Sequence, residues 1–363
     1  MPTPKPPVLE ISNLLVTRGS EFDLVIDQLS LHQGEILAIL GPNGAGKSTL
    51  LLTISKLLAP TSGSIEFFGK NFDQLNDLEY RRNIALVLQD PLLFDTTVYN
   101  NIRTGLGFRG FSKSDQSEQV EAWIERLKID HLRDRHAAQL SSGQAQRVSL
   151  ARALVLNPAI LLLDEPFSPL DSPTRDALLE DLRHLLSESE TTTVFITHDQ
   201  EQAISLGDRV AVILDGRLRQ VGSPEEVFSS PTDSEVANFL GVENVLPGIV
   251  RDSTDGKISV DVQDHILEVI GTEQAGRQVF FCLRPEDITI WKTTDMPRSS
   301  ARNILKGKVA LISTQGPLLE ITLDCGFPLT ALITRASAQD LELEMGTIVS
   351  ASFKASAAHL IPR

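Results

Sequence analysis

The chain has 363 residues, a formal net charge of -15 and two cysteines. This length exceeds what one hydrophobic core usually serves, so we expect two domains. The acidic balance argues against nucleic acid as a partner, and two cysteines are too few for a disulfide framework or a four-ligand zinc site. No apolar run approaches the roughly 18 residues of a membrane-spanning helix. Residues 1–7 indicate a flexible leader rather than a secretory signal, so we place the protein in the cytoplasm.

The first informative segment is an apolar run at residues 36–40, which ends in a glycine-rich turn and is followed by a helical pattern from Lys47 to about Leu58. Two further apolar runs, at 159–163 and 193–196, also precede helix-like stretches. Uninterrupted apolar runs are typical of buried parallel strands. Each run stops at polar or charged residues, and open parallel sheets bind ligands beyond the carboxyl ends of their strands. The sequence therefore predicts a ligand crevice at that edge.

Helical spacing dominates between about residues 112 and 156, where Val120, Trp123, Ile124 and Leu127 share one face of a predicted helix. We therefore expect a helical subdomain within about residues 90–156, inside a first domain of residues 1–240.

After Leu240 the pattern changes, because short β-branched runs such as 258–262 and 319–323 alternate with period two. This predicts a mainly β second domain at residues 241–363. The segments after Val245 and after Ile304 could each form half of a small barrel.

The segment between the first strand and its helix fits the phosphate-loop pattern in the required context. Its glycines let successive backbone N–H groups approach phosphates, and the helix start adds positive potential. The lysine is placed to meet the β- and γ-phosphates of a nucleotide, and the serine after it to ligate Mg²⁺. The predicted binding residues are Gly41, Pro42, Asn43, Gly44, Ala45, Gly46, Lys47, Ser48 and Thr49.

An acidic pair, Asp164 and Glu165, follows the second apolar run. Asp164 is placed to hold Mg²⁺ through water, and Glu165 to polarise the water that attacks the γ-phosphate. This pair and the phosphate loop together predict nucleotide hydrolysis.

Just ahead of the acidic pair, Leu140-Ser141-Ser142-Gly143-Gln144 resembles the signature of the ATP-binding cassette (ABC) superfamily. The resemblance implies an α/β P-loop NTPase fold, with a parallel sheet core and antiparallel β and helical subdomains. It also implies a head-to-tail homodimer with ATP and Mg²⁺ at the interface, in which Ser141, Gly143 and Gln144 contact the nucleotide held by the other subunit. Ser142 stands where the family usually has glycine.

Three more positions match family motifs. Gln89 resembles the switch glutamine, which also ligates Mg²⁺, and His198 resembles the γ-phosphate sensor. The run from Ser168 to Asp171 resembles the segment that crosses the dimer interface, with Asp171 among the nucleotide-site residues. The resemblance thus implies Glu165, His198 and Gln89 as catalytic residues.

The adenine-stacking tyrosine of the family has no counterpart in residues 16–19. Arg18 could stack through its guanidinium plane, or Phe22 could substitute, and the sequence favours neither.

The chain has one cassette, no fused membrane span and no long coiled coil, which favours an importer subunit. Apolar residues 91–98 follow Gln89 where importer ATPases receive the coupling helix of their permease. Residues 222–244 resemble the segment that connects the cassette to the regulatory domain in importer ATPases. Residues 283–288 resemble a motif within such regulatory domains. The resemblance implies two copies on transmembrane permease subunits at the cytoplasmic face of the membrane, served indirectly by an extracellular substrate-binding protein. A soluble ABC ATPase without a permease and an oxyanion-storing binding protein remain alternatives.

Residues 299–309 and 349–356 resemble the small molybdate- and tungstate-binding β domains, which implies an OB/TOBE-like or Mop-like barrel and a molybdate or tungstate cargo. A tetrahedral oxyanion needs hydroxyl and N–H donors near positive charge. Sulfate, iron or sugar as cargo, and a barrel that binds no ligand, remain alternatives. The candidate oxyanion residues are Ser300, Arg302, Asn303, Lys354 and Ser356.

Overall fold

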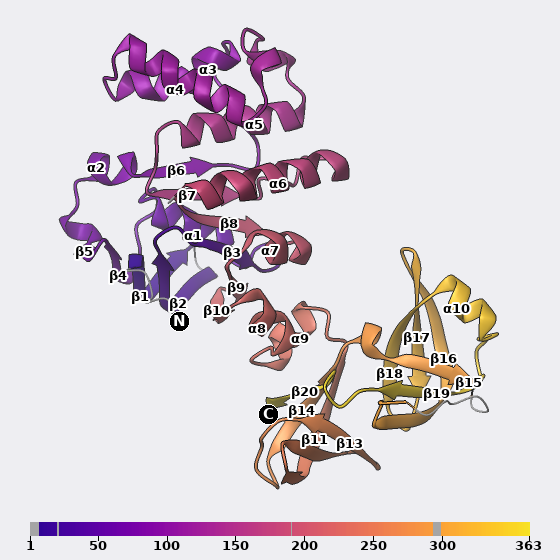
Figure 1. Cartoon of the computed structure of the whole chain (residues 1–363). Helices are drawn as coiled ribbons and strands as arrows, with labels where there is room; N and C mark the ends of the chain where they lie inside the picture. Colours follow the sequence, from indigo (N-terminus) through magenta and orange to yellow (C-terminus); the bar gives the residue numbers. More distant parts are fainter. Residues whose placement is uncertain (1–6, 20–21, 190, 293–298) are drawn as a thin grey trace. The chain divides into compact units, whose positions relative to one another are not determined.

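The computed structural model describes residues 7–19, 22–189, 191–292 and 299–363. Of the leader expected at residues 1–7, residues 1–6 lie outside the described part and Pro7 begins strand β1 (Pro7–Arg18). The chain divides into two compact units, Met1–Pro224 and Glu225–Arg363 (Figure 1). No helix among the described residues is long and apolar enough to cross a membrane.

The centre of the first unit's sheet consists of the three apolar runs that the sequence predicts as buried strands. They are β3 (Ile36–Leu40), β7 (Ile160–Asp164) and β8 (Thr192–Thr197), and every residue is buried except the last of β7. The strands pair in parallel, with β8 between β3 and β7. In this register the carboxyl-terminal residues of the three strands lie level to within one residue. Their carboxyl ends therefore share one edge of the sheet, which confirms the predicted parallel core.

Antiparallel strands extend this core on one side. In the described part of the unit the sheet order is β5-β4-β1-β2-β10-β9-β3-β8-β7-β6, where the additional strands are β1 (Pro7–Arg18), β2 (Phe22–His32), β4 (Ser62–Phe67), β5 (Lys70–Asn71), β6 (Ile84–Val87), β9 (Arg209–Leu214) and β10 (Arg217–Gly222). Strands β6 and β9 pair in parallel with β7 and β3. Strand β1 pairs antiparallel with both β2 and β4.

The predicted helical subdomain is present as α3 (Val98–Phe108), α4 (Lys113–Arg126) and α5 (Ser142–Leu154), which lie together in Figure 1. On the predicted apolar face, Val120 and Ile124 are buried, whereas Trp123 is half-buried. The other helices of this unit are α1 (Lys47–Ile54), α2 (Asp77–Arg82), α6 (Ser172–Glu188) and α7 (Gln200–Leu206).

Two short helices, α8 (Pro224–Ser229) and α9 (Ser234–Phe239), precede the domain boundary that the sequence suggests. The Arg284 guanidinium donates hydrogen bonds to the carbonyl oxygens of Phe228 at 2.8 Å and Leu240 at 3.4 Å. These contacts tie both helices to the β-rich unit, and the compact unit that contains it begins at Glu225, within α8.

The second unit is mainly β, as the period-two pattern predicts. One sheet has the order β13-β12-β11-β14-β20 and the other β15-β19-β16-β17-β18, and the aromatic rings of Phe281 and Phe353, one from each sheet, lie 5.9 Å apart in a shared core. The first sheet comprises β11 (Asn244–Thr254), β12 (Lys257–Val262), β13 (His265–Ile270), β14 (Gln278–Leu283) and β20 (His359–Pro362). The second comprises β15 (Thr289–Lys292), β16 (Asn303–Gln315), β17 (Leu318–Asp324), β18 (Pro328–Thr334) and β19 (Ile348–Phe353), with α10 (Arg335–Asp340) after β18.

The two sheets of the second unit are not formed by two successive halves of its sequence. The last strand, β20, returns to pair with β14 of the first sheet. Pairing between segments so distant in sequence depends on the shared core and not on local pattern.

Candidate functional site

The phosphate loop joins β3 to α1, and its geometry explains two of its glycines. A Cβ on Gly41 would lie 2.2 Å from the carbonyl oxygen of Ile213. Gly46 has a φ of 101°, and a Cβ there would lie 2.8 Å from Cζ of Phe22. Among the described residues no side chain caps the start of α1, so its first N–H groups are available to an anion.

Lys47 is the cation of this loop, and its side chain is only 6% exposed. Its Nζ donates hydrogen bonds to the carbonyl oxygens of Gly41 at 2.8 Å and Pro42 at 3.0 Å. Burial lowers the pKa of Lys47, while the carboxylates of Glu165 and Asp164 raise it. The loop's own backbone thus holds an ammonium group in the wall of the site.

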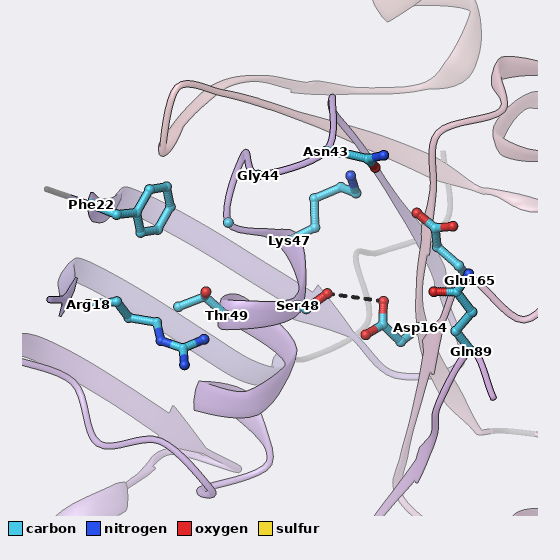
Figure 2. Close-up of a pocket in the computed structure, with 11 residues that line it drawn as sticks. Arg18, Phe22, Asn43, Gly44, Lys47, Ser48, Thr49, Gln89, Asp164 and Glu165 are labelled. Atoms are coloured by element: carbon cyan, nitrogen blue, oxygen red, sulfur yellow. Dashed lines mark hydrogen bonds between the residues drawn. The ribbon is translucent and has the colours of Figure 1, made fainter. Parts of the chain in front are cut away.

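Three side chains with oxygen donors line the cavity beside this lysine: Ser48, Gln89 and Asp164. Ser48 Oγ donates a 3.3 Å hydrogen bond to Asp164 Oδ1 (Figure 2). Burial raises the pKa of Asp164, and the hydrogen bond from Ser48 lowers it. Mg²⁺ prefers oxygen ligands, and it is usually held by one or two protein groups together with phosphates and waters. The three side chains fit such an ion.

Glu165 follows β7 and occupies a left-handed backbone conformation, with a φ of 45°. Its Oε2 accepts a 2.7 Å hydrogen bond from Ser168 Oγ and lies 3.3 Å from His198 Nδ1. The Glu165 side chain is 15% exposed and that of His198 59%. A left-handed non-glycine residue is costly and persists only where its surroundings hold it, which is common at functional sites.

The cavity has a volume of about 550 Å³. Arg18 and Phe22, the two alternatives for adenine contact, both line it and pair across the β1–β2 hairpin. Its lining residues are Arg18, Phe22, Asn43, Gly44, Gly46, Lys47, Ser48, Thr49, Gln89, Asp164 and Glu165 (Figure 2). Of the other predicted loop residues, Gly41, Pro42 and Ala45 do not line the cavity.

The predicted signature residues lie elsewhere in the same unit. Ser141 caps α5 in a capping box with Gln144, where Gln144 N donates to Ser141 Oγ at 3.4 Å and Ser141 N donates to Gln144 Oε1 at 3.1 Å. A Cβ on Gly143 would lie 2.7 Å from Thr174 Cγ2, whereas Ser142 is exposed and has room for its hydroxymethyl group. Neither these residues nor Asp171 line the cavity of their own chain.

The five candidate oxyanion residues do not converge on one site. Asn303 is buried, and its side-chain amide bonds to the backbone of Glu268 through Nδ2 at 2.8 Å and Oδ1 at 2.7 Å. Arg302 Nε lies 3.3 Å from Glu268 Oε2. The other three are exposed.

Ser300 and Lys354 line a second cavity, of about 310 Å³, together with the carboxylates of Glu286 and Asp287. Ser356 is not among its lining residues. The predicted set is therefore divided between a structural contact and a cavity of mixed charge.

The hydrogen bond from Ser168 to Glu165 is the contact that sequence reasoning missed, although Ser168 itself was noted as part of an interface segment. The two residues are three positions apart, in a turn whose backbone bonds Ser168 N to Glu165 O at 3.2 Å. Their closeness in sequence was the available signal.

Comparison with known proteins gives a consistent result. The ABC transporter family profile matches residues 26–168, and the TOBE domain profile matches residues 299–360. The chain is 40% identical over 344 residues, covering 94% of this chain and 96% of the relative, to a molybdate/tungstate import ATP-binding protein of Pyrococcus horikoshii. It is also 37% identical over 346 residues to a sulfate/thiosulfate import ATP-binding protein of Synechococcus elongatus, and the match covers 95% of this chain and 94% of the relative.

Among solved structures, the chain is similar to the ATP-binding cassette MJ0796, a dimer in a post-hydrolysis state with ADP and Pi. The TM-score is 0.54 and the identity 30%, with 60% of this chain and 98% of that chain covered. Family membership and the predicted fold class are thereby established on grounds independent of the cavity.

Proposed function

This chain belongs to the ABC transporter family of import ATP-binding proteins, and we propose on that premise that it hydrolyses ATP with Mg²⁺ to power the uptake of molybdate or tungstate. One observation carries the ATPase chemistry: the phosphate loop, Asp164 and Glu165 line a single cavity. The cargo rests on the molybdate/tungstate relative, which is similar over 94% of this chain. Sulfate is the second candidate, since the sulfate/thiosulfate relative is nearly as similar.

In this proposal the loop N–H groups and Lys47 bind the β- and γ-phosphates, with the ammonium held in place by Gly41 and Pro42. Ser48, Gln89 and Asp164 are the side chains that would hold Mg²⁺. When bound, the ion neutralises charge on the transferring phosphoryl group.

Glu165 would accept a proton from the attacking water. Ser168 and His198 both contact its Oε2, so the carboxylate is oriented while Oε1 has no hydrogen-bond partner recorded within the described residues. General-base action needs a fixed carboxylate within reach of water. His198 contributes through its second ring nitrogen, which can donate to a γ-phosphate oxygen when both nitrogens carry protons.

A second copy of the chain would complete each site. Ser141, Gly143, Gln144 and Asp171 do not line the cavity of their own chain, which supports the head-to-tail homodimer implied by the signature. The start of α5 suits an anion because its N–H groups and the Ser141 hydroxyl are close together.

The segment after Gln89 supports docking on transmembrane permease subunits. Leu92 and Phe94 are 68% and 50% exposed, and exposed apolar side chains grouped on one short segment often mark a protein interface. Docking there would put the chain at the cytoplasmic face of the membrane, with an extracellular binding protein acting only through the permease.

For the second unit, a barrel without an oxyanion at the five predicted residues is the better supported alternative. Asn303 is occupied by Glu268 backbone groups, and two carboxylates line the cavity that holds Ser300 and Lys354. Negative charge there opposes a dianion.

The test is uptake by vesicles that contain the permease and this chain, with ATP and Mg²⁺ on the side of the chain and the substrate-binding protein on the opposite side. We expect uptake of tungstate or molybdate, and we expect a tenfold excess of sulfate not to inhibit that uptake. Uptake of sulfate alone would reassign the cargo, and ATP hydrolysis that no permease influences would favour the soluble ATPase.

A further inference from the structure

The signature helix carries an arginine at its far end that contacts the segment following Gln89. Arg152 Nη1 donates a 2.7 Å hydrogen bond to the carbonyl oxygen of Leu92, and its guanidinium carbon lies 5.6 Å from the ring centroid of Phe94. Burial lowers the pKa of Arg152, and no carboxylate among the described residues contributes to the shift. A partly desolvated cation without a counter-ion is costly, so its interactions with a carbonyl and an aromatic ring must hold it there.

A side chain of α3, that of Asn101, also holds the backbone of this segment. Asn101 is fully buried, and its side chain accepts a hydrogen bond from Phe94 N at 2.8 Å and donates to Phe94 O at 3.1 Å. Residues 91–94 form no helix or strand, so these two side chains largely decide where the exposed side chains of Leu92 and Phe94 lie.

Helix α5 connects the contacts of Arg152 with residues 91–94 to the signature. Ser141 is the N-cap of α5, and Arg152 lies in its last turn. At a rise of 1.5 Å per residue, these two residues lie about 17 Å apart along the helix axis. Because a packed helix moves as a unit, a shift of residues 91–94 that carries Arg152 with it also shifts Ser141 and Gly143.

We propose that Arg152 is a positioning residue that couples residues 91–94 to the placement of the signature. The inference rests on the proposed function, in which a permease docks on residues 91–94, and it adds that docking shifts them. Arg152 does not line the nucleotide cavity, so its effect reaches ATP hydrolysis through α5 and not through contact with ATP in its own chain.

The decisive variant is Arg152→Met, which keeps an unbranched half-buried side chain but removes the charge and the N–H donors. The matched control is Arg126→Met. Arg126 lies in α4 of the same subdomain, and its guanidinium carbon stacks 5.0 Å from the ring centroid of Trp123. The rescue variant is Arg152→Lys, which restores a cation and a donor.

In the complex with permease, we expect Arg152→Met to reduce permease-stimulated ATP hydrolysis by about tenfold, a loss of about 1.4 kcal/mol. Arg126→Met should stay within twofold of the unsubstituted protein, and Arg152→Lys should recover most of the stimulation. The affinity of the isolated chain for ATP should change less than twofold. Full stimulation of Arg152→Met, or an equal loss in Arg126→Met, would overturn the proposal.

Amide hydrogen exchange of the isolated chain separates this inference from the proposed function. Arg152→Met should speed exchange both at residues 92–97 and at residues 141–146, whereas Arg126→Met should change neither. If no permease stimulates the unsubstituted chain, the importer role fails, yet the exchange result still decides the coupling. Faster exchange at 92–97 alone would show that Arg152 only anchors the segment. Should Arg152→Met not fold, Arg152→Leu, which also lacks the charge and the N–H donors, replaces it with the same expectations.

Discussion

The imidazole Nδ1 of His198 lies 3.3 Å from Oε2 of Glu165. This contact joins the ends of two neighbouring parallel strands, since Glu165 follows β7 and His198 follows β8. It orients the carboxylate that we propose as the general base, together with the Ser168 hydroxyl on the same oxygen.

Glu165→Gln keeps the size of the side chain but removes the group that accepts a proton. We expect ATP binding within a few-fold of normal, with hydrolysis reduced by about 10² to 10⁴ and the ATP-bound dimer trapped. Single-turnover hydrolysis and size-exclusion chromatography with ATP and Mg²⁺ measure both effects. Near-normal turnover would remove Glu165 from this role.

Ser168→Ala removes the 2.7 Å hydrogen bond to Glu165 Oε2. A hydrogen bond to a charged group contributes about 1.5–3 kcal/mol, and His198 remains as a second contact. We therefore expect kcat to fall by about three- to tenfold while KM for ATP stays nearly constant. The matched control is Ser187→Ala, whose exposed hydroxyl bonds only its own helix at His184 O. A change in KM alone would contradict a role through Glu165.

The burial of His359 leads us to expect that acid lowers the free energy of unfolding of the second unit. Burial lowers the pKa of His359 to about 4, and Arg284 adds to the shift; Nε2 has no hydrogen-bond partner in the described structure. The unfolded chain, with an ordinary pKa of about 6.5, binds more protons below that pH than the folded chain does. Stability is therefore fully present above pH 6.5 and falls as the pH drops towards 4, by at most about 3 kcal/mol from this residue.

Urea unfolding of His359→Leu at pH 4.5 and pH 7 measures this effect. A Trp123→Phe background leaves Trp291 of the second unit as the sole fluorescent tryptophan reporter, since the chain has two tryptophans. The substitution should reduce the difference in the free energy of unfolding between the two pH values. An unchanged difference in His359→Leu would rule out the burial argument.

Asn303→Ala tests whether this residue supports the barrel or an oxyanion. It leaves the N–H and C=O of Glu268 without their side-chain partner, which should destabilise the second unit by about 1–3 kcal/mol. We expect the same loss with and without millimolar tungstate, measured by thermal unfolding of the whole chain. Ser356→Ala, at an exposed position, is the control. A loss that appears only with tungstate would return Asn303 to the oxyanion site.

Local pattern determined much of this protein. The glycine and lysine spacing of residues 41–49 identified the phosphate loop, because that spacing lets successive backbone N–H groups and the lysine surround a phosphate. The apolar runs located β3, β7 and β8, because strands buried on both faces are mostly apolar along their length. Parallel pairing then made it foreseeable that Asp164 and the phosphate loop would meet.

Only the tertiary structure decided the remaining relationships. Asn303 had the chemistry of an oxyanion ligand, but the approach of β13 gave its amide a backbone partner. Arg152 shows no partner in the sequence, and packing of α5 against residues 91–94 supplied a carbonyl and an aromatic ring. The start of the second unit likewise depended on Arg284, which reaches carbonyl groups more than forty residues earlier. Such contacts join distant segments, and they form only once the cores have brought those segments together.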